Sequence, residues 1–151
     1  MEGKIRYADF GDAELIAGFQ VKMALETEQL ELDPEVVKLG VTSVLNDSSK
    51  GFYLVFEEAG RVAGCLMITK EWSDWRARWV WWIQSLYVLP GLRQKGIFKR
   101  MYDYLISVLE RDPDVAGIRL YVDRTNIRAR KVYEAIGMNG EHYQLFEWMK
   151  G

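Results

Sequence analysis

LYVLPGLRQKGIFKRM, residues 86–101, is the stretch of sequence from which the fold class follows. An apolar, strand-like run ends at Val88, and apolar residues recur at helical spacing from Ile97 to Met101. Gly96 stands at the start of this helix, where the missing Cβ lets a ligand come close to the backbone. A loop of this kind exposes N–H groups at a helix N-terminus, and such groups suit a phosphate or pyrophosphate. The segment therefore predicts an anion site between a strand and a helix.

Four cations accompany this loop, at Arg93, Lys95, Lys99 and Arg100. Cations in a first helical turn oppose the helix dipole by about 0.3–1 kcal/mol each when exposed, so a bound anion would compensate them. Ordinary solvated side chains are the alternative, because a penalty of this size is small. The whole chain has 20 Lys and Arg against 22 Asp and Glu, and its net charge of -2 gives no field that attracts nucleic acid. Any anion site is therefore expected to be local.

The rest of the sequence divides into segments of strand and helix periodicity. In the order β-α-α-β-β-β-α-β-α-β, the expected elements cover residues 4–7, 15–23, 34–46, 52–56, 62–68, 79–88, 97–108, 118–123, 129–136 and 143–149, with a polar and aromatic loop at 71–76. The middle strands make hairpins, whereas the late strand-helix-strand passages need crossovers. We predict an α/β fold with a mixed, mostly antiparallel central sheet flanked by helices.

The composition suits one folded domain over residues 1–151, with 49% hydrophobic and 28% charged residues. Cys65 is the single cysteine, so it forms no internal disulfide, and we expect a buried thiol in a reducing cytoplasm. Neither a signal-peptide core nor an apolar run of about 20 residues occurs, so no membrane partner is expected. His142 has no Cys or His at ligand spacing, and no metal site is expected.

Two stretches resemble the GNAT N-acetyltransferase superfamily. The sequence RQKGIF at 93–98 resembles its coenzyme A-binding motif, Q/R-x-x-G-x-G/A, although Phe98 stands where the motif has Gly or Ala. The run GIRLYV at 117–122, followed by N-x-x-A-x-x-x-Y-x-x-x-G-M at 126–138, is similar to its second signature region. The resemblance covers about residues 80 to 140, and the first half matches in element order alone.

The resemblance implies that acetyl-coenzyme A is the cosubstrate. Its pyrophosphate would be held by the loop, through Arg93, Gln94, Lys95, Gly96, Ile97 and Phe98, and its pantetheine arm would pair with the end of the preceding strand, at Leu86, Tyr87 and Val88. Asn126 would add a hydrogen bond to the arm, or would only cap the following helix. Tyr133 would protonate the departing thiolate, and a core aromatic with a satisfied hydroxyl is the alternative.

The acceptor side of the site is less well marked. The strand that often supplies a carboxylate in this family has Gln84 and Ser85, neither of which is a base at neutral pH, so a water chain or another carboxylate is required. Acidic and aromatic side chains that could bind a cationic amine are Glu26, Glu28, Trp72, Asp74 and Trp75. Solvated surface charges are the alternative for the three acids.

The leading hypothesis is an enzyme that transfers an acetyl group from acetyl-coenzyme A to a primary amine, by direct attack in a ternary complex. The alternative is a non-catalytic module that binds coenzyme A as a regulatory ligand, which the missing base and Phe98 favour. A nucleic-acid-binding domain is disfavoured by the negative net charge. The acceptor would be a small-molecule or peptide amine, and the aromatic richness together with the resemblance favours a homodimer. The acceptor, the general base and the oligomeric state are left open.

Overall fold

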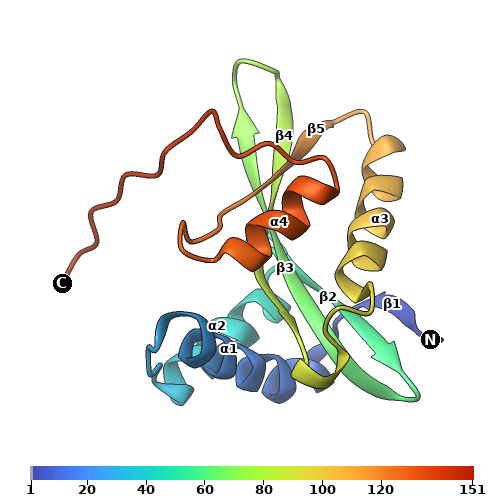
Figure 1. The fold of residues 1–151 in the computed structure, drawn as a ribbon, viewed down its shortest axis with the longest axis vertical. Helices are drawn as coiled ribbons and strands as arrows, with labels where there is room; N and C mark the ends of the chain where they lie inside the picture. The colour runs from blue at the N-terminus through green and yellow to red at the C-terminus, as the bar shows by residue number, and fades with distance from the viewer. Residues whose placement is uncertain (1) are drawn as a thin grey trace. The chain divides into compact units, whose positions relative to one another are not determined.

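The computed structural model describes every residue except Met1. The chain divides after Tyr121 into two compact units, residues up to 121 and residues 122–151. The first unit holds the sheet and three helices, and the second holds one helix and the C-terminal segment (Figure 1).

The first unit is built on a five-stranded sheet in the order β1-β2-β3-β4-β5. Its strands are β1 Lys4–Tyr7, β2 Phe52–Glu58, β3 Arg61–Ser73, β4 Arg78–Val88 and β5 Val115–Leu120. The first four are antiparallel neighbours, and β5 runs parallel to β4. Ala59 and Gly60 connect β2 to β3 with positive φ at both positions, as a two-residue hairpin turn requires. The predicted mixed, mostly antiparallel sheet is confirmed.

Helices cover both faces of this sheet (Figure 1). They are α1 Ala13–Glu28, α2 Pro34–Asn46 and α3 Ile97–Glu110, with short 3-10 turns η1 Phe10–Asp12 and η2 Pro90–Leu92. One buried cluster joins α1 and α2 to the sheet around Phe19 and Val55, and a second joins α3 to the other face around Leu66 and Met101. Because β5 is parallel to β4, α3 is the crossover that the sequence predicts between them.

A bulge in β4 changes which side chains face which helices. Between the register pairs Met67↔Gln84 and Cys65↔Tyr87, β4 has two residues and β3 has one. The bulged strand contains Ser85, whose φ is 55. Side chains four residues apart in a regular strand share a face, but Ile83 packs in the cluster under α3 and Tyr87 in the cluster under α1 and α2. The extra residue therefore sends Tyr87 toward α1.

The hairpin between β3 and β4 is longer than the sequence predicts. The expected loop at 71–76 is wrong in its first half, because β3 continues to Ser73 and only residues 74–77 connect the strands. Trp72 pairs with Trp79 across the hairpin, with ring centroids 5.1 Å apart in an edge-to-face arrangement. Aromatic cross-strand pairs stabilise a two-stranded ribbon, and this pair extends the strands into the segment expected to be a loop.

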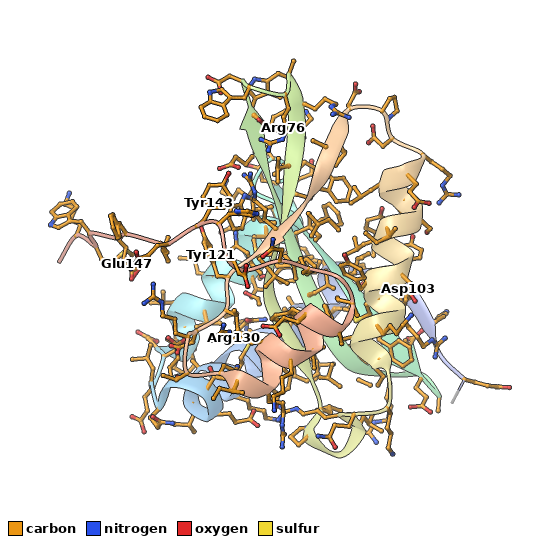
Figure 2. All side chains as sticks on the ribbon, turned by 45° about the horizontal axis from the view of Figure 1, so that its top comes forward. Arg76, Asp103, Tyr121, Arg130, Tyr143 and Glu147 are labelled. Atoms are coloured by element: carbon orange, nitrogen blue, oxygen red, sulfur yellow. The ribbon has the colours of Figure 1, made fainter. Side chains whose placement is uncertain are left out.

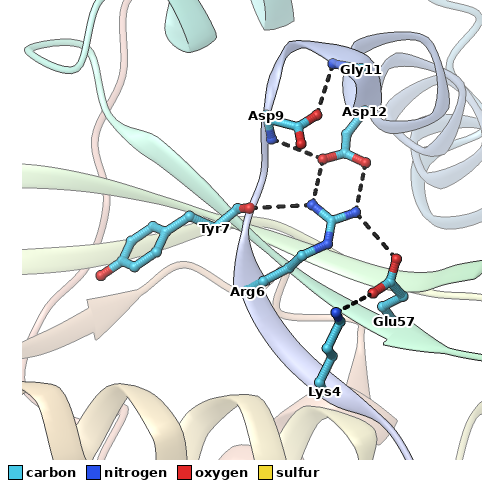
Figure 3. A network of polar contacts seen from close by, with 7 residues as sticks. All are labelled: Lys4, Arg6, Tyr7, Asp9, Gly11, Asp12 and Glu57. Carbon is cyan, nitrogen blue, oxygen red and sulfur yellow. Dashed lines mark hydrogen bonds and ion pairs between the residues drawn. The ribbon is translucent and has the colours of Figure 1, made fainter. Parts of the chain in front are cut away.

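A polar network fixes the entry into α1 (Figure 3). Asp12 precedes the helix, but its carboxylate makes no capping bond to α1. It accepts two hydrogen bonds from Arg6, at 2.8 and 3.0 Å, and one from the Asp9 N–H at 2.9 Å. Arg6 also lies 3.6 Å from Glu57 on β2. The ion pair with Arg6 lowers the pKa of Asp12, so this nearly buried carboxylate is charged at neutral pH.

The second unit contains α4, Ile127–Ala135, and a C-terminal segment without regular structure. Asn126 caps α4, since its Oδ1 accepts a hydrogen bond from the Ala129 N–H at 3.1 Å. The expected strand at 143–149 is wrong: Tyr143 and Glu147 lie in an extended segment outside any strand (Figure 2). Apolar alternation alone does not make a strand, because the backbone groups also need a neighbouring strand to bond with.

Candidate active site

The pairing between β4 and β5 ends before β4 does. Ile83↔Leu120 is the last register pair between them, and β4 continues to Val88. The Leu89 N–H donates to Ala63 on β3 at 3.0 Å, so by the antiparallel alternation the backbone groups of Val88 point away from β3. In the part of the chain that the structure describes, no strand of the sheet covers this edge of β4 beyond Ile83. An extended, amide-bearing ligand could therefore bond along this edge as an added strand, where the Val88 carbonyl also accepts a hydrogen bond from Arg93 Nε at 2.8 Å.

The loop after β4 takes two left-handed turns before the start of α3. Gln94 and Gly96 both have positive φ, at 62 and 79, which turns the chain twice between η2 and the helix. Gly96 is the N-cap residue, and among residues 2–151 no side chain caps α3 and no acidic residue lies in its first turn. The first turn of a helix directs N–H groups outward without helical partners. The first turn of α3 therefore starts without a capping side chain from residues 2–151, and the anion site at this loop stays a prediction.

The four cations near this loop do not act as one cluster. Lys99 pairs with Asp103 at 2.7 Å, and Arg100 donates to the Gly3 carbonyl at 2.9 Å. Arg93 pairs with Glu26 on α1 at 3.2 Å. Lys95 is exposed, and no hydrogen bond or ion pair to another residue from Glu2 onward occupies its ammonium group. Three of the four cations are therefore engaged within the protein, and Lys95 is the one best placed to meet an added anion.

Phe98 departs from the family motif without filling the loop. Its side chain packs against the core cluster under α3, with its ring centroid 6.0 Å from that of Tyr102. This packing against the core accounts for a large residue where the motif has a small one. Ile97 is likewise 2% exposed and anchors the start of α3 in the same cluster.

Glu26 joins the end of α1 to the end of β4 and to the loop. The Tyr87 hydroxyl donates to Glu26 Oε2 at 2.8 Å, and Arg93 Nη2 lies 3.2 Å from Oε1. Arg93 also donates from Nε to the Val88 carbonyl at 2.8 Å and lies over the Tyr87 ring, 5.2 Å from its centroid. Burial, followed by the hydrogen bond to Glu26, raises the pKa of Tyr87. Sequence reasoning missed this network because Glu26 is more than 60 residues away from Tyr87 and Arg93 in the chain.

The candidate acceptor residues lie at two places in the first unit. Glu26 and Glu28 are in the last turn of α1, and Glu26 contacts Tyr87. Trp72, Asp74 and Trp75 are at the tip of the β3–β4 hairpin, where Trp75 is 90% exposed. Trp79, which contacts Trp72, and Tyr87 are eight residues apart in β4, or about 26 Å at 3.3 Å per residue. The structure therefore does not bring these five residues together.

The polar residues of the bulged strand do not supply a base. Gln84 donates from Nε2 to the Thr69 hydroxyl at 2.7 Å, which fixes its amide on β3. Tyr133, in the second unit, is half-buried on α4, and burial raises the pKa of its phenol. A raised pKa keeps this hydroxyl protonated at neutral pH, as a proton donor requires.

A cavity of about 400 Å³ lies elsewhere in the first unit. Its lining combines α1, β1 and the β2–β3 turn, and includes Lys22, Glu57, Arg61 and Leu89.

Among the described residues, no group of three or more His, Cys, Asp or Glu side chains could hold a metal ion. None of the helices from Glu2 onward has the length and apolar character that crossing a bilayer requires.

Comparisons with known proteins agree with this geometry. A family model described as "Acetyltransferase (GNAT) family" matches residues 19–138. The solved structure of a possible acetyltransferase from Clostridium difficile 630 is 39% identical, with a TM-score of 0.92 over 99% of each chain. No curated protein sequence matches the chain.

Two more distant structures share the fold. A predicted acetyltransferase from Clostridium acetobutylicum, solved with acetyl-CoA, is 18% identical, with a TM-score of 0.74 over 97% of this chain and 96% of that one. The aminoglycoside N-acetyltransferase AAC(6')-Iy, solved with CoA, is 14% identical, with a TM-score of 0.79 over 99% of this chain and 96% of that one. The family match over 19–138 and the 39% identical relative decide the assignment: the chain belongs to the GNAT family of acetyltransferases.

Proposed function

We propose that the protein is an acetyl-CoA-dependent N-acetyltransferase that acts on a primary amine by direct attack in a ternary complex. The observation that carries the proposal is the open edge of β4 next to the uncapped start of α3, within a chain of the GNAT family. The structures solved with acetyl-CoA and with CoA have the same fold, which supports the same cosubstrate here.

The cosubstrate would bind mainly through the backbone. The pantetheine amides would bond with the strand end at Leu86, Tyr87 and Val88, as an added strand does. The pyrophosphate would be held by the N–H groups of the loop and of the first turn of α3, with Lys95 supplying positive charge. The loop residues proposed for this role are Arg93, Gln94, Lys95, Gly96, Ile97 and Phe98. Asn126, whose Oδ1 caps α4, is proposed to add a contact from its amide.

The chemistry needs one nucleophile and two proton transfers. The neutral amine nitrogen attacks the thioester carbonyl, a C–N bond forms, and the C–S bond of the tetrahedral intermediate breaks. The thiolate takes a proton from a general acid, for which we propose Tyr133, and the ammonium proton of the adduct leaves to water or a base. Fixing both substrates in one complex turns the attack into an intramolecular step.

The acceptor is proposed to be a small-molecule or peptide amine. The AAC(6')-Iy structure belongs to an enzyme that acetylates aminoglycosides, which supports an amine as the acceptor class for this fold. Acidic and aromatic side chains bind ammonium groups by charge and by ring faces. The candidates are Glu26 and Glu28 at one end of β4, and Trp72, Asp74 and Trp75 at the other. A small amine would contact one of these two groups.

The test is a thiol-release assay. Purified protein is incubated with acetyl-CoA and a panel of amines, and free coenzyme A is followed over time. Release that depends on both the protein and one class of amine supports the proposal. The absence of release with every amine, in protein that binds acetyl-CoA, contradicts the enzymatic part.

A second candidate is a regulatory module that binds coenzyme A without turnover. The observation that favours it is the lack of a carboxylate at Gln84 and Ser85, where the family often has one. Tight binding of coenzyme A with no product, and no difference between the unaltered protein and Tyr133→Phe, would support this alternative.

We propose a single acetyltransferase domain, since the family match at 19–138 spans both compact units. The buried free thiol of Cys65 supports a reducing cytoplasm. We also propose a homodimer, because the rings of Trp72 and Trp75 are exposed at the tip of the β3–β4 hairpin. Sedimentation equilibrium measures the oligomeric state. Nucleic acid and membrane are not proposed as partners.

A further inference from the structure

Glu26 makes contacts that are unusual for a surface carboxylate at a helix end. Both of its oxygens are engaged, one by the hydroxyl of Tyr87 at 2.8 Å and one by the guanidinium of Arg93 at 3.2 Å. Tyr87 is 4% exposed and fixed in the core, with its ring centroid 5.1 Å from that of Phe19 on α1. The carboxylate is therefore held by a rigid partner on the sheet and in turn holds a residue of the loop.

Arg93 is fixed from three directions. Its Nε donates to the Val88 carbonyl at 2.8 Å, its Nη2 meets Glu26, and its guanidinium lies over the Tyr87 ring at 5.2 Å. Two of these contacts are with the last residues of β4. The first residue of the loop motif is thus folded back under the strand end, and the main chain of 94–96 takes its two left-handed turns directly after this anchored point.

The bulge in β4 makes this arrangement possible. Without the extra residue, Tyr87 would share a face with Ile83 and point toward α3. Because the alternation shifts, the Tyr87 ring lies under α1, where its hydroxyl reaches the last helical turn. The bulge and the Glu26 contact are therefore parts of one arrangement at the strand end.

We propose that Glu26 is a positioning residue that holds the coenzyme A-binding loop in its ligand-ready shape through Arg93 and Tyr87. The inference rests on the proposed function and specifies one part of its site. Glu26 acts through Arg93 on the loop backbone, and its own carboxylate does not touch the pyrophosphate.

An ordinary surface ion pair is the competing explanation. Glu26 and Arg93 side chains are each 37% exposed, and isolated pairs of that kind contribute about 0–1 kcal/mol. The carbonyl, ring and hydroxyl contacts distinguish this pair from Lys38–Glu14, which joins α2 to α1 through one contact between exposed groups. Glu14 is therefore the matched control on the same helix.

The experiment measures coenzyme A affinity by calorimetry for the unaltered protein, Glu26→Gln, Tyr87→Phe and Glu14→Gln. Loss of a hydrogen-bonded charge at the anchor is expected to weaken binding about tenfold in Glu26→Gln. Tyr87→Phe removes one hydroxyl, keeps the ring, and is expected to weaken binding by a smaller factor. It provides the test if Glu26→Gln does not fold. Glu14→Gln is expected to bind like the unaltered protein.

Two further readouts separate positioning from a general loss of structure. With acetyl-CoA varied at a saturating concentration of an amine that the protein acetylates, Glu26→Gln should raise the KM for acetyl-CoA by a larger factor than it lowers kcat. With S-acetylpantetheine as the acyl donor, which lacks the pyrophosphate, kcat/KM should be the same for Glu26→Gln and for the unaltered protein. In a double-mutant cycle, Glu26→Gln should add nothing to the loss of affinity already caused by Arg93→Gln.

Weaker coenzyme A binding with unchanged use of S-acetylpantetheine supports the inference. Unchanged or tighter binding in Glu26→Gln overturns it, and tighter binding would mean that Glu26 competes with phosphate for Arg93. Equal losses with both acyl donors also overturn it, since the effect is then not confined to the loop. No binding of coenzyme A by the unaltered protein overturns the proposed function itself.

Discussion

Ile83 on β4 faces Leu120 on β5, and this is the last pair of residues that joins the two parallel strands. Past this point β5 has ended, while β4 continues for five residues to Val88. The strand edge from Gln84 to Val88 leads into the loop before α3. An extended ligand proposed for this edge would make strand-like hydrogen bonds and would place an anionic group near the start of the helix.

Replacing Tyr133 with phenylalanine should lower kcat while leaving coenzyme A binding in place. The change removes the hydroxyl that we propose as the proton donor and keeps the ring, and a positioned general acid contributes about 10²–10⁴-fold to a rate. Steady-state thiol release measures kcat, and calorimetry measures the binding. A variant as active as the unaltered protein would remove Tyr133 from the mechanism.

Replacing Gly96 with alanine should weaken coenzyme A binding, because φ at this position is 79 and side chains with a Cβ adopt that conformation at a cost of about 1–2 kcal/mol. A Cβ at Gly96 would meet nothing within 4 Å, so the effect comes from the backbone and not from a clash. Gly91→Ala is the control in the same loop, since Gly91 has no positive φ and similar open space. Equal affinities for the two variants would contradict the role of the left-handed turn.

Replacing Asp12 with asparagine should destabilise the fold by about 2 kcal/mol at neutral pH, since Arg6 loses the charge that it binds. The ion pair lowers the pKa of Asp12 below its unfolded value of about 3.9, so its contribution is complete above that pH and disappears as the pH falls through the lower folded pKa. Urea unfolding at several pH values measures this. Asp12→Asn should lose less stability than the unaltered protein between neutral and acidic pH. A parallel loss in both proteins would show that Asp12 does not carry the acid sensitivity.

Cys65 should resist thiol reagents in the folded protein. It is fully buried, and burial raises the pKa of its thiol to about 12, so the reactive thiolate is scarce at neutral pH. Labelling with a chromogenic disulfide at pH 8 should be absent without denaturant and complete in urea. Fast labelling of the folded protein would disagree with the packing of Cys65 in the core, and would also interfere with thiol-release assays.

Much of the fold could be predicted from local patterns. The strand, loop and helix at 86–101, the capped start of α2 at Asp33 and the two-residue turn at Ala59 and Gly60 all depend on neighbours in the sequence. The expected strand at 143–149 was wrong because a strand also depends on a partner, which alternating residues do not supply.

The candidate site could be predicted only in part, for the same reason. The glycine loop has a local signal, but the contact between Tyr87 and Glu26 joins residues 61 positions apart, and no motif marks it. The bulge has a weak signal in the sequence, because the apolar residues Trp81 and Ile83 alternate at even spacing and the next apolar residue of this series is Leu86, one position later than expected.

The extra residue near Ser85 implies that the length of β4 matters more than the side chain at that position. Any residue that tolerates a positive φ could stand at 85, but a deletion there would exchange the two faces of the strand for every residue up to Val88. Tyr87 would then turn from α1 toward α3, and Glu26 would lose its partner on the sheet. Among relatives of this chain, the presence or absence of one residue in this strand is thus a more informative difference than many substitutions around it.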